Sequence, residues 1–377
     1  MKVVIAIDSF KGSLTSLEAG NAAADGILRA LPDAETIVVP IADGGEGTVD
    51  ALVQGMNGNI REITVTDPLG RPVSAQYGVI EDTAVIEMSA AAGITLLKED
   101  ELDPMNTTTY GVGEIIRDAI GIGCREFIIG IGGSATNDGG IGMLQALGFD
   151  MLDRNGDQVS YGAKGVSELA QIAITGSIPE LNECKFFIAS DVTNPLCGIN
   201  GCSMIYGPQK GATPEQITDM DNWLAHYSTL TKKLYPDADS DYPGAGAAGG
   251  IGFAFETYLN ATLEPGIDFI LDKTGLSGYL PDADIVITGE GRLDGQTVMG
   301  KAPIGVARKA KEFGKPVIAF AGSIGNDAIA CNDNGIDAFF PILRKVCSID
   351  DALDKETAKK NMADTVEQVF RMIVVFF

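Results

Sequence analysis

Residues 126–148, EFIIGIGGSATNDGGIGMLQALG, contain the unit that recurs along this chain: an apolar strand, a glycine-rich turn and an amphipathic helix. EFIIGI is typical of a buried strand, and residues 138–148 are predicted to form a helix. The turn between them, GGSATNDGG (132–140), has little side chain and many backbone N–H groups. It is either a tight connection capped by Asn137 or Asp138, or a cradle for an anion at the positive end of the helix.

Two ligands are possible for this turn. As a phosphate or carboxylate cradle it would offer backbone amides, including those of Gly132 and Gly133, together with the orienting side chains of Ser134, Thr136 and Asn137. A helix end attracts an exposed anion by only about 0.3–1 kcal/mol, so cationic side chains are also needed. Alternatively, GIGGSA (130–135) fits the G-x-G-x-x-A fingerprint of dinucleotide sites, with Asp150 at a suitable distance for a ribose.

The same alternation of strand and helix predicts an α/β fold with a mainly parallel sheet. Expected strands lie at 2–8, 36–43, 126–131, 185–190, 284–288, 316–322 and 336–342. Thr15 and Glu18 form a capping box for the first helix. Residues 61–89 instead alternate with period two and carry turn signals at 67–70 and 81–82. That segment is predicted to be an antiparallel hairpin.

The opening segment supplies only two strands, too few for a sheet covered on both faces, and the closing segment supplies three more. We therefore predict that residues 1–65 and 285–377 form one discontinuous domain, with 66–284 inserted as a second α/β domain. A cleft between the domains is the expected ligand site. The alternative is two consecutive domains that meet near residue 165.

Composition excludes several classes of function. The net charge is −25, from 27 Lys and Arg against 52 Asp and Glu, which argues against a nucleic-acid partner. No apolar run approaches the roughly 18–20 residues of a membrane helix, so no membrane partner is expected. The first residues resemble a strand and not a signal peptide, which predicts a cytoplasmic location.

Histidine and cysteine contribute little to the expected chemistry. The six cysteines form no C-x-x-C pair, and the one histidine, His226, lies off the apolar stripe of a predicted helix. GQTVMGKA (295–302) nearly matches a P-loop but has Ala302 in place of the hydroxyl residue that binds Mg²⁺. The chemistry is therefore expected from carboxylates, Lys and Arg.

Such residues gather after the predicted strands, where open α/β sheets bind their ligands. Five segments share this feature, namely DSFKGSLT with Asp8, Ser9 and Lys11, ADGGEGT with Asp43 and Glu46, ASDVTNP with Asp191 and Asn194, GPQKGAT with Lys210, and TGEGRLDGQT with Glu290, Arg292 and Asp294. Phosphoryl transfer needs carboxylates for Mg²⁺ and for a hydroxyl proton, and cations for the moving phosphate. Hydride transfer needs fewer acids, but an NAD(P)-dependent hydroxy-acid oxidoreductase stays as the alternative.

Seven segments in order resemble the type-1 glycerate kinase family: DSFKGSL, ADGGEGT, GGSATNDGG, SDVTNPL, GPQKGAT, PGAGAAGG and TGEGRLDGQTVMGKAPIGVA. The similarity extends from the first strand to about residue 322. It implies an ATP-dependent kinase that converts D-glycerate to 2-phosphoglycerate. It also implies a Rossmann-like parallel sheet with an inserted flavodoxin-like α/β domain.

Chemistry suggests roles for the candidate residues. Asp8, Ser9 and Asn194 are expected to contact a substrate or its phosphates. Asp191 is the expected general base or orienting group for the glycerate hydroxyl. Lys11 and Arg292 are expected to hold the glycerate carboxylate or the migrating phosphoryl group, and Lys210 the phosphates of ATP. Mg²⁺ is expected on Asp43, Glu46 or Glu290. The glycine-dense segment PGAGAAGG (243–250) is expected to pack closely against another backbone, with a second anion site as the alternative.

Overall fold

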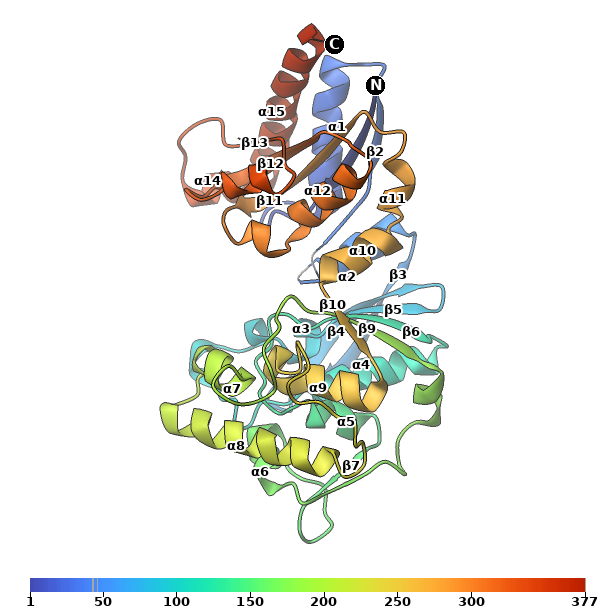
Figure 1. Cartoon of the computed structure of the whole chain (residues 1–377), viewed down its shortest axis with the longest axis vertical. Helices are drawn as coiled ribbons and strands as arrows, with labels where there is room; N and C mark the ends of the chain where they lie inside the picture. The colour runs from blue at the N-terminus through green and yellow to red at the C-terminus, as the bar shows by residue number, and fades with distance from the viewer. Residues whose placement is uncertain (43, 46, 377) are drawn as a thin grey trace. The chain divides into compact units, whose positions relative to one another are not determined.

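The computed structural model describes residues 1–42, 44, 45 and 47–376 (Figure 1). The chain forms two compact units. The terminal unit comprises Met1–Asp43, Asp50–Asn57 and Pro265–Phe377, and the inserted unit comprises Gly44–Val49 and Gly58–Glu264. No helix in the described part of the chain is long and apolar enough to cross a membrane.

The terminal unit is built on a parallel sheet with the order β13-β12-β11-β1-β2. Its strands are β1 (Lys2–Ile7), β2 (Glu35–Val38), β11 (Ile285–Leu293), β12 (Val317–Ile324) and β13 (Ala338–Pro341). Numbered along the chain, this order is 2-1-3-4-5, the flavodoxin-type arrangement of a doubly wound sheet. The mixed α/β class with parallel sheets is confirmed. The flavodoxin-like strand order is found in the terminal unit, for which a Rossmann-like sheet was expected. Strand order depends on the crossovers between strands, and the periodicity of the sequence does not encode them.

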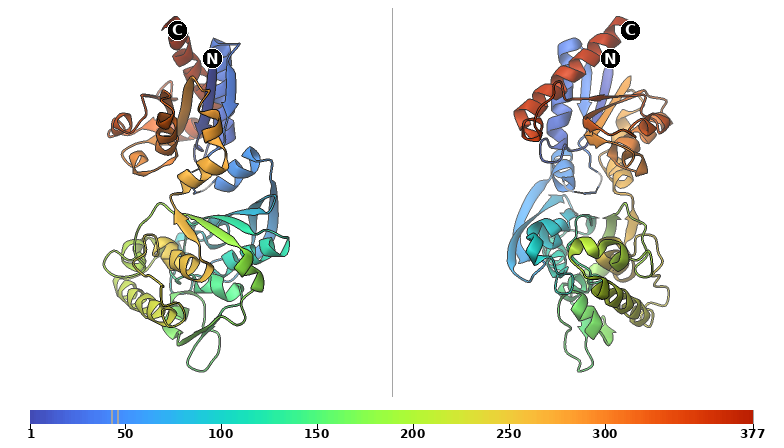
Figure 2. Two further views of the ribbon diagram at one scale, coloured as in Figure 1. Left: turned by 45° about the vertical axis from the view of Figure 1, so that its right-hand side comes forward. Right: turned by 90° about the vertical axis from the view of Figure 1, so that its left-hand side faces the viewer.

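Alternation along β1 explains how both faces of this sheet are covered. Val3, Ile5 and Ile7 point into a core with α1 (Ser16–Ala30) and α15 (Lys355–Phe376). Val4 and Ala6 point into the opposite core, which is covered by α10 (Gly266–Lys273), α11 (Leu276–Tyr279) and α12 (Ala302–Glu312). Figures 1 and 2 show α1 and α15 side by side on one face of the sheet. The shorter helices of this unit are α13 (Ala330–Asp333) and α14 (Ile349–Leu353), and α2 (Thr48–Gly55) spans the limit between the two units.

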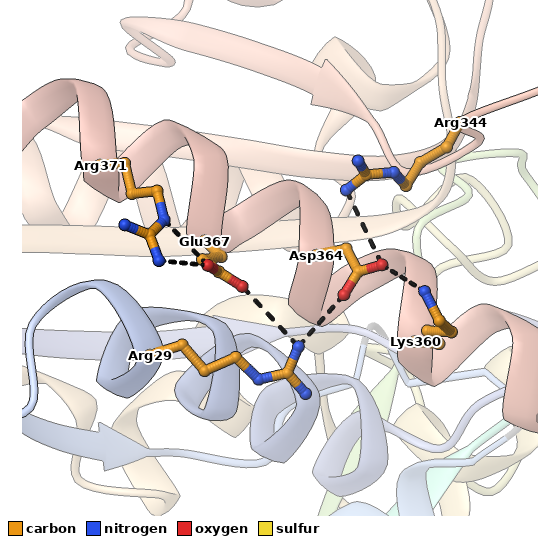
Figure 3. Close-up of polar contacts among 6 residues, drawn as sticks. All are labelled: Arg29, Arg344, Lys360, Asp364, Glu367 and Arg371. Atoms are coloured by element: carbon orange, nitrogen blue, oxygen red, sulfur yellow. Dashed lines mark hydrogen bonds and ion pairs between the residues drawn. The ribbon is translucent and has the colours of Figure 1, made fainter.

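The close approach of α1 and α15 requires a glycine. A Cβ on Gly26 would lie 2.3 Å from the carbonyl oxygen of Ala363, which no side chain tolerates. At the exposed rim of this contact, Arg29 Nη1 lies 3.1 Å from Asp364 Oδ1 and 3.8 Å from Glu367 Oε2. Figure 3 shows these ion pairs together with those of Arg344, Lys360 and Arg371. Each exposed pair contributes about 0–1 kcal/mol, so the buried apolar contact dominates.

Glu18 on α1 forms ion pairs with α15, which makes the contact between the two helices depend on pH. Burial opposes the charge of its carboxylate. Contacts from Lys355 Nζ at 2.7 Å and Lys359 Nζ at 3.1 Å, and a hydrogen bond from the Thr15 amide, outweigh burial and lower the pKa of Glu18 to about 2.

Replacement of Glu18 is expected to change the acid sensitivity of the protein. A carboxyl whose pKa is lower in the folded than in the unfolded chain stabilises the fold above its unfolded pKa of 4.5, and this stabilisation is lost as the pH falls toward 2. The difference in free energy of unfolding between the native protein and Glu18→Gln should therefore be largest at pH 7 and shrink steadily below pH 4.5. Urea unfolding followed by circular dichroism at pH 7, 4.5 and 3 measures it. Glu312→Gln, an exposed acid on α12, is the control, and an equal difference at all three pH values would contradict the expectation.

The inserted unit has a six-stranded mixed sheet of order β10-β9-β6-β5-β4-β3. Its strands are β3 (Asn59–Thr66), β4 (Pro72–Ile80), β5 (Thr83–Glu87), β6 (Glu126–Gly130), β9 (Lys185–Ala189) and β10 (Thr262–Glu264). The strands β5, β6, β9 and β10 are parallel, and β3, β4 and β5 are antiparallel. The predicted antiparallel hairpin is therefore confirmed. Its turn is closed by the Asp67 carboxylate, which accepts hydrogen bonds from the Leu69 and Arg71 amides, both at 2.8 Å.

Helices and a small second sheet complete the inserted unit. The helices are α3 (Ser89–Ala92), α4 (Tyr110–Gly121), α5 (Ile141–Ala146), α6 (Gly162–Glu168), α7 (Cys202–Tyr206), α8 (Pro214–Thr231) and α9 (Ala247–Leu259). The second sheet pairs β7 (Asp150–Leu152) with β8 (Gln171–Ala173). His226 lies on α8 and is exposed.

The limits of the units differ from the predicted 1–65, 66–284 and 285–377. β3 pairs with β4 over its whole length, which places residues 59–66 in the inserted unit. Residues 266–280 lie in the terminal unit, because Ile267, Leu271 and Leu276 enter the core beneath its sheet. In both places tertiary pairing, invisible to local periodicity, decides the assignment.

Candidate active site

The terminal unit holds a cavity of about 710 Å³ at the carboxyl ends of β1, β11, β12 and β13. Five predicted site residues line it: Asp8, Ser9, Lys11, Glu290 and Arg292. Asp294 and Lys301 also line it. Sequence positions 282 residues apart meet here, because β1 and β11 are parallel neighbours and Ile7 pairs with Gly289. This is the strand edge at which doubly wound sheets bind ligands.

Two buried carboxylates belong to this cavity. Asp8 is 4% and Glu290 7% exposed. The Ser9 amide donates a hydrogen bond of 2.7 Å to Asp8 Oδ1, and Thr297 Oγ1 donates one of 2.6 Å to Glu290 Oε1. Lys301 Nζ lies 3.8 Å from Glu290 Oε2. Burial of a carboxylate without a cation or hydrogen-bond donors costs several kcal/mol, so these partners offset part of the cost of burying the two acids at the cavity.

Two cationic side chains at the same cavity are much more exposed to solvent than these acids. Lys11 is exposed, and the Arg292 side chain is 68% exposed, with its Nε 3.1 Å from Asp294 Oδ2. An exposed guanidinium retains donors for a ligand, and its planar fork suits a carboxylate or a phosphate. The cavity therefore combines buried acids with exposed cations.

In the inserted unit, the structure corrects the prediction for the start of the helix after GGSATNDGG. The helix α5 spans only Ile141–Ala146, because Gly139 and Gly140 have left-handed φ values of +63° and +79°. The carboxylate of Asp138, which is fully buried, accepts hydrogen bonds from the Gly140 amide at 3.0 Å and from the amide and Oγ1 of Thr109, both at 2.9 Å. Burial raises the pKa of Asp138. The Asp138 carboxylate thus satisfies the Gly140 amide at the start of this helix, and the binding of an anion by residues 132–137 stays a prediction.

Lys210 stabilises the same glycine-rich turn through hydrogen bonds. It is 2% exposed, and its Nζ donates hydrogen bonds to Ser134 Oγ at 2.8 Å and to the Thr136 carbonyl at 2.6 Å. Burial lowers the pKa of Lys210 to about 8. Lys210 was predicted as a contact for ATP phosphates, and the structure places its ammonium group on two oxygens of the turn. Three predicted site residues, Lys210, Ser134 and Thr136, are therefore in direct contact.

Two polar atoms in this turn have no hydrogen-bond partner among the described residues. Asn137 Nδ2 donates a hydrogen bond of 2.8 Å to Ser203 Oγ, but Asn137 Oδ1 and Thr136 Oγ1 are buried and unsatisfied. Unpartnered buried polar atoms are rare in native proteins, and each calls for an explanation such as a functional role or a bound water or ion. Gly132 and Gly133, by contrast, are exposed and form the accessible part of the turn.

The segment PGAGAAGG supports this turn by backbone contact, as predicted. A Cβ on Gly249 would lie 2.0 Å from the Thr136 carbonyl oxygen, and one on Gly246 would lie 2.1 Å from the Pro195 carbonyl oxygen. The Gly249 carbonyl also accepts a hydrogen bond from the Gly139 amide at 2.9 Å. The close-packing interpretation of PGAGAAGG is confirmed.

Asp191 and Asn194 follow β9, the parallel neighbour of β6, whose end carries the glycine-rich turn. Because Gly130 pairs with Ala189, the two loops leave the sheet at the same edge. Asp191 is exposed. Asn194 is held within its own loop, since its Oδ1 accepts from the Tyr206 hydroxyl at 2.7 Å and its Nδ2 donates to the Asn200 carbonyl at 2.9 Å. Lys11 and Arg292 belong to the terminal unit, and Ser134 and Asp191 to the inserted unit.

Glu87 was missed in the sequence. It pairs with Gly130 at the end of β5, and its Oε1 accepts hydrogen bonds from the amides of Gly47 and Val49, both at 3.0 Å. It therefore tethers the predicted ADGGEGT motif to the inserted unit. The sequence did contain a signal for Glu87, because this acid stands at the end of the apolar strand TAVIE, as the other candidate residues stand at strand ends. Asp43 and Glu46, the predicted Mg²⁺ ligands of that motif, lie outside the described residues.

A comparison with known proteins decides the family. The model of the glycerate kinase family matches residues 3–374. The chain belongs to the glycerate kinase family. Its members are phosphotransferases, which favours the kinase interpretation over the hydroxy-acid oxidoreductase.

Individual members of the glycerate kinase family are similar over nearly their whole length. A glycerate kinase from Haemophilus influenzae is 45% identical over 100% of both chains. A glycerate 2-kinase from Escherichia coli K12 is 47% identical over 93% of each chain. The crystal structure of a candidate glycerate kinase 2 from Salmonella typhimurium LT2 has a TM-score of 0.92 and 44% identity, and covers 100% of this chain and 98% of that one.

Proposed function

We propose that this chain transfers the γ-phosphoryl group of ATP to the 2-hydroxyl of D-glycerate and forms 2-phosphoglycerate. The observation that carries the proposal is the family match over residues 3–374. The choice of the 2-hydroxyl is supported by the E. coli relative that is named glycerate 2-kinase. The cytoplasmic location and D-glycerate as the small-molecule partner stay predictions that agree with this activity.

The acids of the terminal unit suit a magnesium ion that accompanies the nucleotide. Among residues 1–42, 44, 45 and 47–376, no three Asp, Glu, His or Cys side chains form a metal-binding group. Mg²⁺ in kinases needs only one or two carboxylates, because phosphate oxygens and water complete its octahedron. Asp8 and Glu290 would supply them, and Asp43 and Glu46 stay predicted ligands. Bound there, Mg²⁺ would neutralise phosphate charge.

The remaining roles follow from positioning and electrostatics, which dominate catalysis of phosphoryl transfer. Lys11 and Arg292 would hold phosphate oxygens or the glycerate carboxylate. Asp191 would orient the attacking hydroxyl and accept its proton. The exposed Gly132 and Gly133, together with Ser134, Thr136 and Asn137, would bind an anionic or hydroxyl group of a substrate.

Phosphorus NMR of the product tests activity and regiochemistry together. With D-glycerate and Mg-ATP, a new phosphate monoester signal should appear as ADP forms. A phosphate on the 2-hydroxyl couples to one carbon-bound proton and gives a doublet, whereas one on the 3-hydroxyl couples to two and gives a triplet. A triplet would refute the regiochemistry. ADP formation without any new monoester, or no ADP at all, would refute the kinase proposal.

A further inference from the structure

The cavity of the terminal unit has an apolar wall that phosphoryl transfer does not explain. It is formed by Ile342 and Leu343, which follow β13, and by three residues of α14, namely Ile349, Ala352 and Leu353. Leu343, Ile349 and Leu353 are 37%, 77% and 43% exposed. Apolar side chains grouped at a concave surface beside charged groups are typical of ligand sites with one apolar and one polar end.

The volume of the cavity exceeds what glycerate requires. At about 710 Å³ it lies within the range of about 300–1,000 Å³ that encloses a drug-sized molecule. A three-carbon acid would leave most of this space empty. A nucleoside triphosphate, with a flat fused ring, a ribose and an anionic tail, has the corresponding size and the corresponding division into apolar and charged parts.

The strand order places the charged end and the apolar end of the cavity at different strands of the sheet. Asp8 directly follows β1, and Glu290 lies in the carboxyl-terminal half of the adjacent strand β11, at the point where the chain order of the sheet reverses. The apolar wall follows β13, three strands from β1 in the order β13-β12-β11-β1. With neighbouring strands about 4.8 Å apart, the two ends of the cavity are roughly 14 Å apart. An extended nucleotide spans such a distance.

We infer that the terminal unit binds ATP with its purine ring against Leu343, Ile349 and Leu353, and with its phosphates toward Lys11 and Arg292. This inference rests on the proposed function and adds which unit binds the nucleotide and which side chains select its base. It leaves the glycine-rich turn of the inserted unit to bind glycerate. Leu343, Ile349 and Leu353 act in binding and not in the transfer step.

Calorimetric binding of two probes, Mg-ATP and Mg-tripolyphosphate, separates the ring contact from the phosphate contact. The double variant Ile349→Gln/Leu353→Gln changes two partly exposed side chains to neutral polar ones, so it is expected to fold, and its melting temperature checks this. Its dissociation constant for ATP should rise about tenfold or more, and that for tripolyphosphate should change less than twofold. Ile329→Gln, at a position 69% exposed and outside the cavity, is the control with unchanged affinities.

Each outcome is decisive. Unchanged ATP affinity in the double variant would overturn the inference while leaving the proposed function intact. An equal loss of affinity for ATP and tripolyphosphate would also overturn it, because the wall would then not contact the ring. If the native chain bound no ATP, the proposed function itself would fail, and with it the inference.

Discussion

Asp191→Asn is expected to lower the turnover number for D-glycerate phosphorylation by about 100-fold or more. Asparagine keeps the shape of the side chain but neither accepts the hydroxyl proton nor presents a negative charge to orient it. Asp191 is exposed in the loop after β9, so the substitution should leave the fold and the melting temperature unchanged. The KM for ATP should also change little, because the substitution acts on the acceptor hydroxyl.

The matched control is Asp237→Asn, which removes one exposed negative charge from the same unit. Steady-state kinetics of both variants, with D-glycerate and with Mg-ATP varied in turn, make the comparison. If Asp191→Asn retained native turnover, or if Asp237→Asn lost as much, the role assigned to Asp191 would be abandoned.

Gly249→Val is expected to destabilise the inserted unit by about 2–5 kcal/mol. Overpacking a close contact costs about 1–3 kcal/mol, and a left-handed backbone with a side chain costs about 1–2 kcal/mol more. Gly249 has φ +75°, and its added Cβ would lie 2.0 Å from the Thr136 carbonyl oxygen. The backbone fixes the position of the Cβ, and the Thr136 oxygen is itself a backbone atom, so no rotamer change relieves the clash. The glycine-rich turn should therefore shift, and activity should be lost with stability.

Urea unfolding followed by tryptophan fluorescence measures this effect in the inserted unit, because the one tryptophan of the chain, Trp223, lies on α8. Gly198→Val separates the two costs: its φ is +90°, but a Cβ there meets no atom within 4 Å. It should lose only the backbone part, about 1–2 kcal/mol. Equal losses in Gly198→Val and Gly249→Val would show that the close contact with Thr136 contributes nothing.

Much of the local structure could be predicted because it depends on neighbours in the chain. Thr15 and Glu18 form the expected capping box at the start of α1. The period-two alternation of residues 61–89 forms the expected hairpin. The polar residues after the strands were recognisable because parallel strands all present their carboxyl ends at one edge, and Asp8, Lys11, Glu290 and Arg292 do line one cavity there.

Other features could not be read from local pattern. Nothing near Asp138 indicates that its carboxylate, and not an external anion, meets the Gly140 amide, because that outcome depends on burial and on Thr109, 29 residues away. Lys210 was expected to contact ATP phosphates, yet it is buried, and its ammonium group donates hydrogen bonds to Ser134 and Thr136. The apolar wall of α14 was missed because exposed Ile and Leu in a short helix carry no signal by themselves.

The sequence by itself determined the alternation of strands and helices, the caps and turns, and the acids and cations after the strands. These follow from backbone periodicity and side-chain chemistry, which act over a few residues. Only the tertiary structure decided the strand order 2-1-3-4-5, the limits of the two units, and which charged groups are buried and paired. Those outcomes depend on contacts between residues up to hundreds of positions apart, whose free energy no local window contains.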